Sequence, residues 1–150
     1  MNRITILLCA VLLMAAATPD RWIGTWKLNP AKSHFESGPL PKSRTMTLEE
    51  VAGGMKAISD LLDDYGSVHI EFSARYDGKD VPMRGSSPGS TIALTRLDAS
   101  TFDSIQKNNG NITVTTRFAV SKDGKILTVS AGGIDPQGKK FTNVSVFDRQ

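Results

Sequence analysis

The chain has 150 residues, with 18 Lys and Arg against 15 Asp and Glu and a formal net charge of +3. This is the length of one ordinary domain. The basic residues are scattered and form no run, which argues against a nucleic-acid partner. The single cysteine, Cys9, lies in an apolar N-terminal stretch; if that stretch is removed, the mature chain has no disulfide, cysteine nucleophile or thiolate metal site.

The N-terminus has the three parts of a secretory signal peptide. Arg3 supplies a positive charge, Ile4 to Met14 is an apolar run, and Ala15-Ala16-Ala17 offers small residues for cleavage. A membrane span needs about 20 apolar residues, so this run is too short to be an anchor. We therefore expect residues 1–17 to be cleaved and residues 18–150 to form a single secreted or periplasmic domain without a membrane span.

The mature chain opens with an expected strand, Trp22-Ile23-Gly24-Thr25-Trp26-Lys27-Leu28-Asn29, in which aromatic, β-branched and Thr residues alternate around one glycine. Residues 29–42 follow, with three prolines and a glycine. That composition excludes a continuous strand or a long helix. It predicts a long ordered loop, with one helical turn around Ala31 to Phe35.

From Ser43 onward the pattern is strand, turn, strand, and each turn contains Gly, Asn or Asp, which tolerate positive φ. Links this short join antiparallel neighbours, so the expected topology is a meander. The expected strands are Arg44 to Val51, Met55 to Leu62, Ser67 to Tyr76, a short piece near Val81 to Met83, Thr91 to Leu97, Thr101 to Lys107, Ile112 to Ser121, Ile126 to Ala131 and Phe141 to Asp148.

The segment Met55 to Leu62 has an alternative. Its apolar residues also fit one face of a two-turn amphipathic helix. We favour a strand because Gly53-Gly54 and the Asp63-Asp64-Tyr65-Gly66 turn flank the segment as they would a hairpin arm.

Apolar and polar residues alternate with period two in the later strands, so each has one dry face and one wet face. Such a meander must protect its dry face and its edges by closing into a barrel or folding into a sandwich. Near-sequential hairpins favour closure. The predicted fold is all-β, an antiparallel up-and-down barrel of about 8–10 strands. The expected dry faces are Val68, Ile70, Phe72, Ala74 and Tyr76 in one strand, and Ile112, Val114, Thr116, Phe118 and Val120 in another.

The Gly24-x-Trp26 motif on the first strand resembles the opening motif of the calycin superfamily, the lipocalins and fatty-acid-binding proteins. With Ser33-x-Phe35, Asp77-Gly78-Lys79-Asp80 and the final Val146-Phe147-Asp148-Arg149, the chain resembles a group of small secreted bacterial lipocalin-like proteins without an assigned activity. The resemblance implies that Trp26 closes one end of the barrel and that an Arg from a late strand packs over its indole. Arg149 occupies a suitable position. Gly24, Trp26 and Arg149 are thus expected to be structural.

Residues that could carry catalysis are sparse. His34 and His69 are the only histidines, and a zinc site needs three or four ligands. His69, Glu71 and Ser73 share a strand face, but alternate residues lie about 7 Å apart, too far for a base to activate a nucleophile. We expect no metal, no cofactor and no enzymatic activity.

A barrel of about eight strands can hold one small ligand in its lumen, and the alternative is that side chains fill the interior. The leading hypothesis is a non-enzymatic barrel that binds a small apolar molecule. The alternatives are a module that recognises a protein or envelope polymer through loops Ala31 to Lys42 and Arg84 to Ser90, and a barrel isomerase or hydrolase. The candidate ligand-binding residues are Met46, Leu48, Ile70, Phe72, Tyr76, Ile92, Leu94, Phe118 and Val129.

Overall fold

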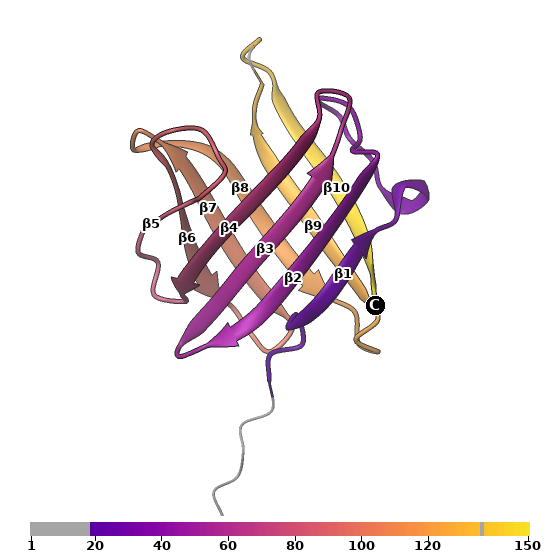
Figure 1. Ribbon diagram of the computed structural model, residues 1–150, viewed down its shortest axis with the longest axis vertical. Helices are drawn as coiled ribbons and strands as arrows, with labels where there is room; N and C mark the ends of the chain where they lie inside the picture. Colours follow the sequence, from indigo (N-terminus) through magenta and orange to yellow (C-terminus); the bar gives the residue numbers. More distant parts are fainter. Residues whose placement is uncertain (1–18, 136) are drawn as a thin grey trace, which may run out of the picture.

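The computed structural model describes residues 19–135 and 137–150. The predicted leader, residues 1–17, and Cys9 lie outside the described residues. The described residues form ten strands and one short 3₁₀ helix (Figure 1). They are β1 (Gly24–Leu28), η1 (Pro30–Lys32), β2 (Ser43–Val51), β3 (Gly54–Leu62), β4 (Ser67–Arg75), β5 (Val81–Pro82), β6 (Ser90–Arg96), β7 (Thr101–Asn108), β8 (Asn111–Val120), β9 (Ile126–Ile134) and β10 (Lys140–Arg149).

The expected strands are confirmed, with ends that shift by at most a few residues, and Gly54–Leu62 is a strand rather than a helix. All ten strands belong to one antiparallel sheet in the order β4-β3-β2-β1-β10-β9-β8-β7-β6-β5. The first strand therefore pairs with the last, with Trp26 opposite Arg149 and Leu28 opposite Phe147. This pairing confirms the predicted meander.

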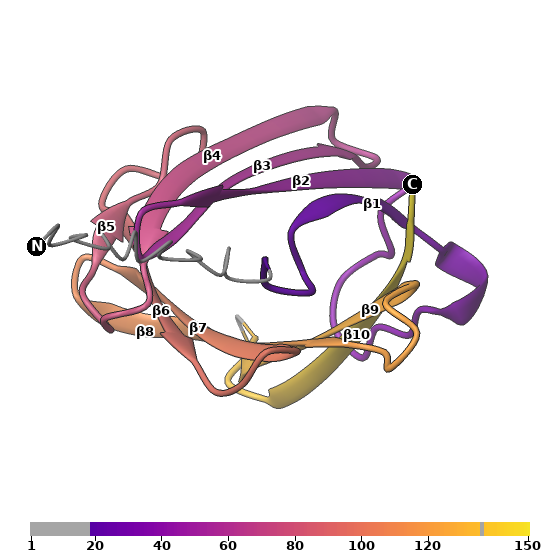
Figure 2. The same cartoon turned by 90° about the horizontal axis from the view of Figure 1, so that it is seen from below.

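The sheet curls into a nearly closed barrel, as the view along its axis shows (Figure 2). The two edge strands of the sheet, β4 and β5, meet at a seam. There the backbone amide of Glu71 donates to the Arg84 carbonyl at 3.1 Å, and the Arg84 amide donates to the Glu71 carbonyl at 2.9 Å. The seam is short because β5 has only two residues. The two backbone hydrogen bonds between Glu71 and Arg84 cover part of the β4 edge.

The proline-rich segment after β1 continues along β10. The amide of Asn29 donates to the Val146 carbonyl at 2.8 Å, and His34 exchanges two backbone hydrogen bonds with Val144. The helical turn in this segment is η1. Residues 29–42 therefore act as an irregular extension of the short first strand and occupy the space between β10 and the start of β2.

The dry face expected for the strand Ile112 to Ser121 is wrong at its first residue. The alternation predicts that Ile112 points inward with Val114, but Ile112 is 61% exposed. The register of β7 and β8 shifts here, so that Gln106 faces Val114 and Lys107 faces Ile112, which leaves one residue of β8 unpaired. This bulge breaks the two-residue period.

Candidate functional site

One end of the barrel, the closed end, is sealed by Trp26 and Arg149. Trp26 is fully buried, and its indole nitrogen donates to the Trp22 carbonyl at 2.8 Å. The guanidinium carbon of Arg149 lies 4.1 Å from the centroid of the Trp26 ring. The same guanidinium donates to the carbonyls of Gly124 at 2.6 Å, Ile23 at 2.8 Å and Arg21. Arg149 thereby satisfies three backbone groups while stacking on the indole.

Aromatic packing fills the rest of the closed end. Trp22 is fully buried, and its ring centroid lies 4.9 Å from that of Phe102 and 5.8 Å from that of Tyr76. The Trp22 indole donates to the Tyr76 hydroxyl at 2.8 Å. Burial raises the pKa of the Tyr76 phenol to about 12. These side chains fill the closed end, and the cavities of the lumen lie beyond them, toward the opposite end of the barrel.

Above this packing lies a small apolar cavity of about 60 Å³, which we call the inner cavity. Its walls come from β2, β3, β4, β6, β7 and β8. Phe118 forms part of it and stacks on Phe102 with 4.3 Å between ring centroids and an interplanar angle of 7°. A water molecule has a share of about 30 Å³ in the liquid, so the inner cavity alone is too small for a drug-sized molecule.

A second cavity of about 260 Å³, the mouth cavity, lies toward the opposite end of the barrel. Val114, Phe118, Val129 and Ala131 line it from β8 and β9, and Phe35 reaches it from the proline-rich segment. Inner and mouth cavities share Arg44, Gln106 and Phe118. Their combined volume reaches the lower end of the range for small-molecule sites, about 300 Å³.

Asn143 fastens the segment that carries Phe35. Its side-chain oxygen accepts hydrogen bonds from the amides of Glu36 at 2.9 Å and Ser37 at 3.1 Å, and its side-chain nitrogen donates to the Ser37 carbonyl at 2.8 Å. The Glu36 carboxylate accepts a hydrogen bond from the Thr142 amide at 2.6 Å. The wall of the mouth that Phe35 provides is therefore tied to β10.

Arg44 is the charged residue where the two cavities meet. It points to the same side of β2 as Met46 and Leu48. Its Nε donates to the hydroxyl of Ser59 at 2.9 Å, and its guanidinium carbon lies 6.0 Å from the centroid of the Phe147 ring. Burial lowers the pKa of the guanidinium. It still carries its charge at neutral pH because an Arg pKa is so high.

The predicted ligand-binding residues fall into three groups. The inner cavity is lined by Met46, Leu48, Ile70, Phe72, Ile92, Leu94 and Phe118. Val129 lines the mouth cavity. Tyr76 lines neither cavity, because its ring packs against Trp22 and Phe102 at the closed end.

The sequence reasoning missed Arg44, Gln106 and Ala131, which also line the cavities. A signal for Arg44 was present, since it alternates with Met46 and Leu48 on the dry side of its strand. The contribution of Phe35 could not be read from the sequence, because it depends on the path of an irregular segment.

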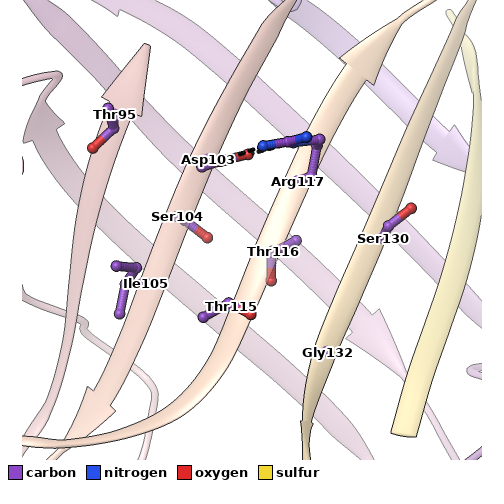
Figure 3. A pocket seen from close by; sticks show the side chains of 9 residues that line it. All are labelled: Thr95, Asp103, Ser104, Ile105, Thr115, Thr116, Arg117, Ser130 and Gly132. Atoms are coloured by element: carbon purple, nitrogen blue, oxygen red, sulfur yellow. Dashed lines mark hydrogen bonds and ion pairs between the residues drawn. The ribbon is translucent and has the colours of Figure 1, made fainter. Parts of the chain in front are cut away.

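The outer wall carries larger but open depressions. One of about 480 Å³ lies over β6 to β9 (Figure 3). Across it, Arg117 and Asp103 form two hydrogen bonds of 2.8 Å between exposed side chains. On another part of the outer wall, His69 Nδ1 lies 2.6 Å from an Asp60 oxygen, and both side chains are more than half exposed. Solvent surrounds these ion pairs, so each contributes little to stability.

Of His69, Glu71 and Ser73, which strand geometry predicts to be too far apart for catalysis, the first two have separate partners. His69 pairs with Asp60, whereas Glu71 pairs with Lys56 at 3.3 Å. Within residues 19–135 and 137–150 there is no group of three or more His, Asp or Glu arranged to hold a metal ion. The same residues contain no helix with the length and apolarity that crossing a membrane requires.

No family model matches the chain, and no curated protein matches it.

Proposed function

We propose that the barrel binds one small lipophilic molecule, with the body of the ligand in the mouth cavity. The observation that carries the proposal is the mouth cavity itself, about 260 Å³ in volume and lined by the aromatic rings of Phe35, Phe118 and Phe141. Burying apolar ligand surface against such rings contributes about 25 cal/mol per Å². The packed closed end fixes how deep a ligand can go.

The proposed role is binding without chemistry. Arg44 is the one charged residue among those lining the inner and mouth cavities in the described chain. A general acid or base has to reach the bond that it acts on, and the His69 and Asp60 pair lies on the outer wall. We propose that the protein acts outside the cytoplasm, on the basis of the leader-like residues 1–17.

The test is a titration of the purified protein with N-phenyl-1-naphthylamine, a neutral fluorophore whose emission rises in apolar surroundings. Two variants on neighbouring positions of β9 separate the inner face from the outer one. Ala131→Phe adds a ring to the mouth cavity, whereas Ser130→Phe adds the same ring to the outer depression.

The expected result is saturable binding to the unchanged protein and to Ser130→Phe, with binding to Ala131→Phe weakened by at least about tenfold. Equal binding by both variants would place the probe outside the lumen and contradict the proposal. Thermal unfolding of each variant checks that the barrel is intact. No contact among the described residues favours the loop-mediated alternative over the lumen.

A further inference from the structure

Two open depressions on the outer wall join into one shallow hollow, which we call the outer trough. The first, of about 480 Å³, lies over β6 to β9 (Figure 3), and the second, of about 640 Å³, lies over β8 to β10. Thr115 and Gly132 line both depressions. Gly132 lies between its register partners Thr115 on β8 and Thr142 on β10. The outer trough is therefore deepest at a strand position that has no side chain.

Among the described residues, nothing requires a glycine at position 132. Its backbone is not in the left-handed region that favours glycine, and an added Cβ would lie 3.7 Å from its nearest neighbour, the Phe141 carbonyl oxygen. Gly133 differs, because a Cβ there would lie 2.8 Å from the Thr113 carbonyl oxygen. Glycine weakens a strand and often marks a place where another backbone approaches closely. Gly132 therefore indicates a close partner on the outer wall.

Exposed isoleucines stand beside this bare position. Ile134 follows Gly132 by two residues on the same face of β9 and is 64% exposed. Ile112 on β8 is 61% exposed, and both isoleucines line the second depression. Ile105 on β7 is 36% exposed and lines the first depression. One face of the barrel thus carries protruding apolar side chains next to a hollow where a side chain is missing.

The charges of the outer trough largely neutralise one another. Arg117 and Asp103 are joined by two hydrogen bonds of 2.8 Å. Lys140 is the one other charged residue among those that line the trough in the described chain. A strongly charged partner would find little net charge to bind, whereas an apolar protein surface would leave no opposite charge unpaired.

We propose that the outer trough is the interface of a symmetric dimer with a second copy of this chain. A two-fold axis makes one patch contact itself, so the patch has to carry both a protrusion and the hollow that receives it. Gly132 and Ile134 meet that requirement, because they lie about 7 Å apart along one strand face. With the axis between them and perpendicular to β9, Ile134 of each copy enters the hollow at Gly132 of the other.

The size of the face sets the strength of this dimer. A patch five strands wide and about six residues long covers about 500 Å², so two copies bury about 1,000 Å² in total. That area is at the lower limit for a specific interface, and we expect a dissociation constant of tens of micromolar. The dimer does not depend on the proposed function, because the outer trough and the lumen cavities lie on opposite faces of the sheet.

The test is sedimentation velocity of the purified protein and three variants between about 1 and 500 µM, because mass action populates a weak dimer only at high concentration. Gly132→Arg fills the hollow with a charged side chain. Ser73→Arg is the matched control, since it adds the same side chain to an exposed position of β4 on another part of the outer wall. Gly132→Ala adds only a methyl group to the hollow.

The unchanged protein and Ser73→Arg are expected to pass from monomer to dimer over this range. Gly132→Arg should weaken the dimer by at least about tenfold, because it buries an unpaired charge in an apolar contact. Gly132→Ala should weaken it too, while the thermal unfolding temperature of the monomer stays the same or rises, since alanine suits a strand better than glycine. That combination separates a contact between copies from a defect in folding.

A protein that stays monomeric throughout the range would overturn the inference. So would a dimer that tolerates Gly132→Arg and Gly132→Ala, or one that Ser73→Arg weakens equally. Monomers whose Ile112 and Ile134 methyl resonances shift when phosphatidylcholine vesicles are added would assign the outer trough to a membrane surface, and this outcome would reject the dimer as well.

Discussion

Arg149, the penultimate residue, lies over the indole of Trp26 with 4.1 Å between the guanidinium carbon and the ring centroid, and the two residues are also register partners in β10 and β1. The last strand is thereby joined to the first by backbone pairing and by a side-chain stack. Three carbonyls, from Gly124, Ile23 and Arg21, accept hydrogen bonds from the same guanidinium. One side chain therefore holds together the segments that meet at the closed end.

Replacing this guanidinium should weaken the whole barrel. Arg149→Lys keeps the charge but cannot reach three carbonyls with one nitrogen. Because this change removes three hydrogen bonds, two of them partly buried, together with the stack on Trp26, we expect the free energy of unfolding to fall by about 2–4 kcal/mol, measured by chemical denaturation. Arg117→Lys, on the exposed outer wall, should cost less than about 1 kcal/mol. Similar losses of unfolding free energy in the two variants would mean that the contacts of Arg149 do not stabilise the closed end.

The stability of the barrel is expected to depend on Gly24 for two separable reasons. Its φ is +139°, and a Cβ at this position would lie 2.5 Å from Nη1 of Arg149. Gly66 provides the control, because its φ is +129° and a Cβ added there would have no other atom within 4 Å. Gly66→Ala measures backbone strain alone, which is worth about 1–3 kcal/mol. Gly24→Ala should cost more, by denaturation, because it also displaces Arg149. Equal costs would show that the contact with Arg149 is unimportant.

The phenol of Tyr76 should make stability depend on alkaline pH. Burial raises its pKa to about 12, above the ordinary value of 10.0. In the unfolded chain the phenol ionises first, so the contribution of the neutral phenol is complete below about pH 10 and is lost as pH rises toward 12. Denaturation at a series of pH values checks this. Tyr76→Phe should remove this part of the alkaline decline, and an unchanged profile in the variant would contradict the assignment.

The segment that carries Phe35 should open more often when the side chain of Asn143 is truncated. Asn143→Ala removes two hydrogen bonds accepted from the Glu36 and Ser37 amides and one donated to the Ser37 carbonyl. Amide hydrogen exchange at residues 36 and 37 should accelerate, because opening of this segment no longer has to break those bonds. Asn111→Ala, at the exposed start of β8, should leave the exchange at both residues unchanged. Unaltered exchange in Asn143→Ala would mean that another contact holds the segment.

Local patterns predicted the strands and their order because each strand is set by its own alternation and each turn by its own Gly, Asn or Asp. The same reasoning failed at Ile112, where a bulge that depends on the partner strand shifts the face. It also placed Tyr76 in the ligand set, because period two carries no information about height along the barrel. Trp22 and Tyr76 pack together although they lie 54 positions apart in the sequence. A pattern of a few neighbouring residues cannot predict such a contact.

The seam and the mouth depend on still longer relationships. The bridge between Glu71 and Arg84 forms only once the sheet has curled. The wall formed by Phe35 exists only because the segment carrying it is bonded to β10. Arg44 was visible as a charge within an apolar alternation, but its place between the two cavities is a property of the folded lumen.

The central claim is that ligands bind inside the barrel rather than on its exposed isoleucines. Ile112 and Ile134 are 61% and 64% exposed and offer an apolar probe an alternative site on the outside. The direct measurement is the set of intermolecular NOEs between bound N-phenyl-1-naphthylamine and the ¹³C-labelled methyl groups of the protein. NOEs to Ala131, Val114 and Val129 are predicted, without NOEs to the two isoleucines. NOEs confined to Ile112 and Ile134 would contradict it.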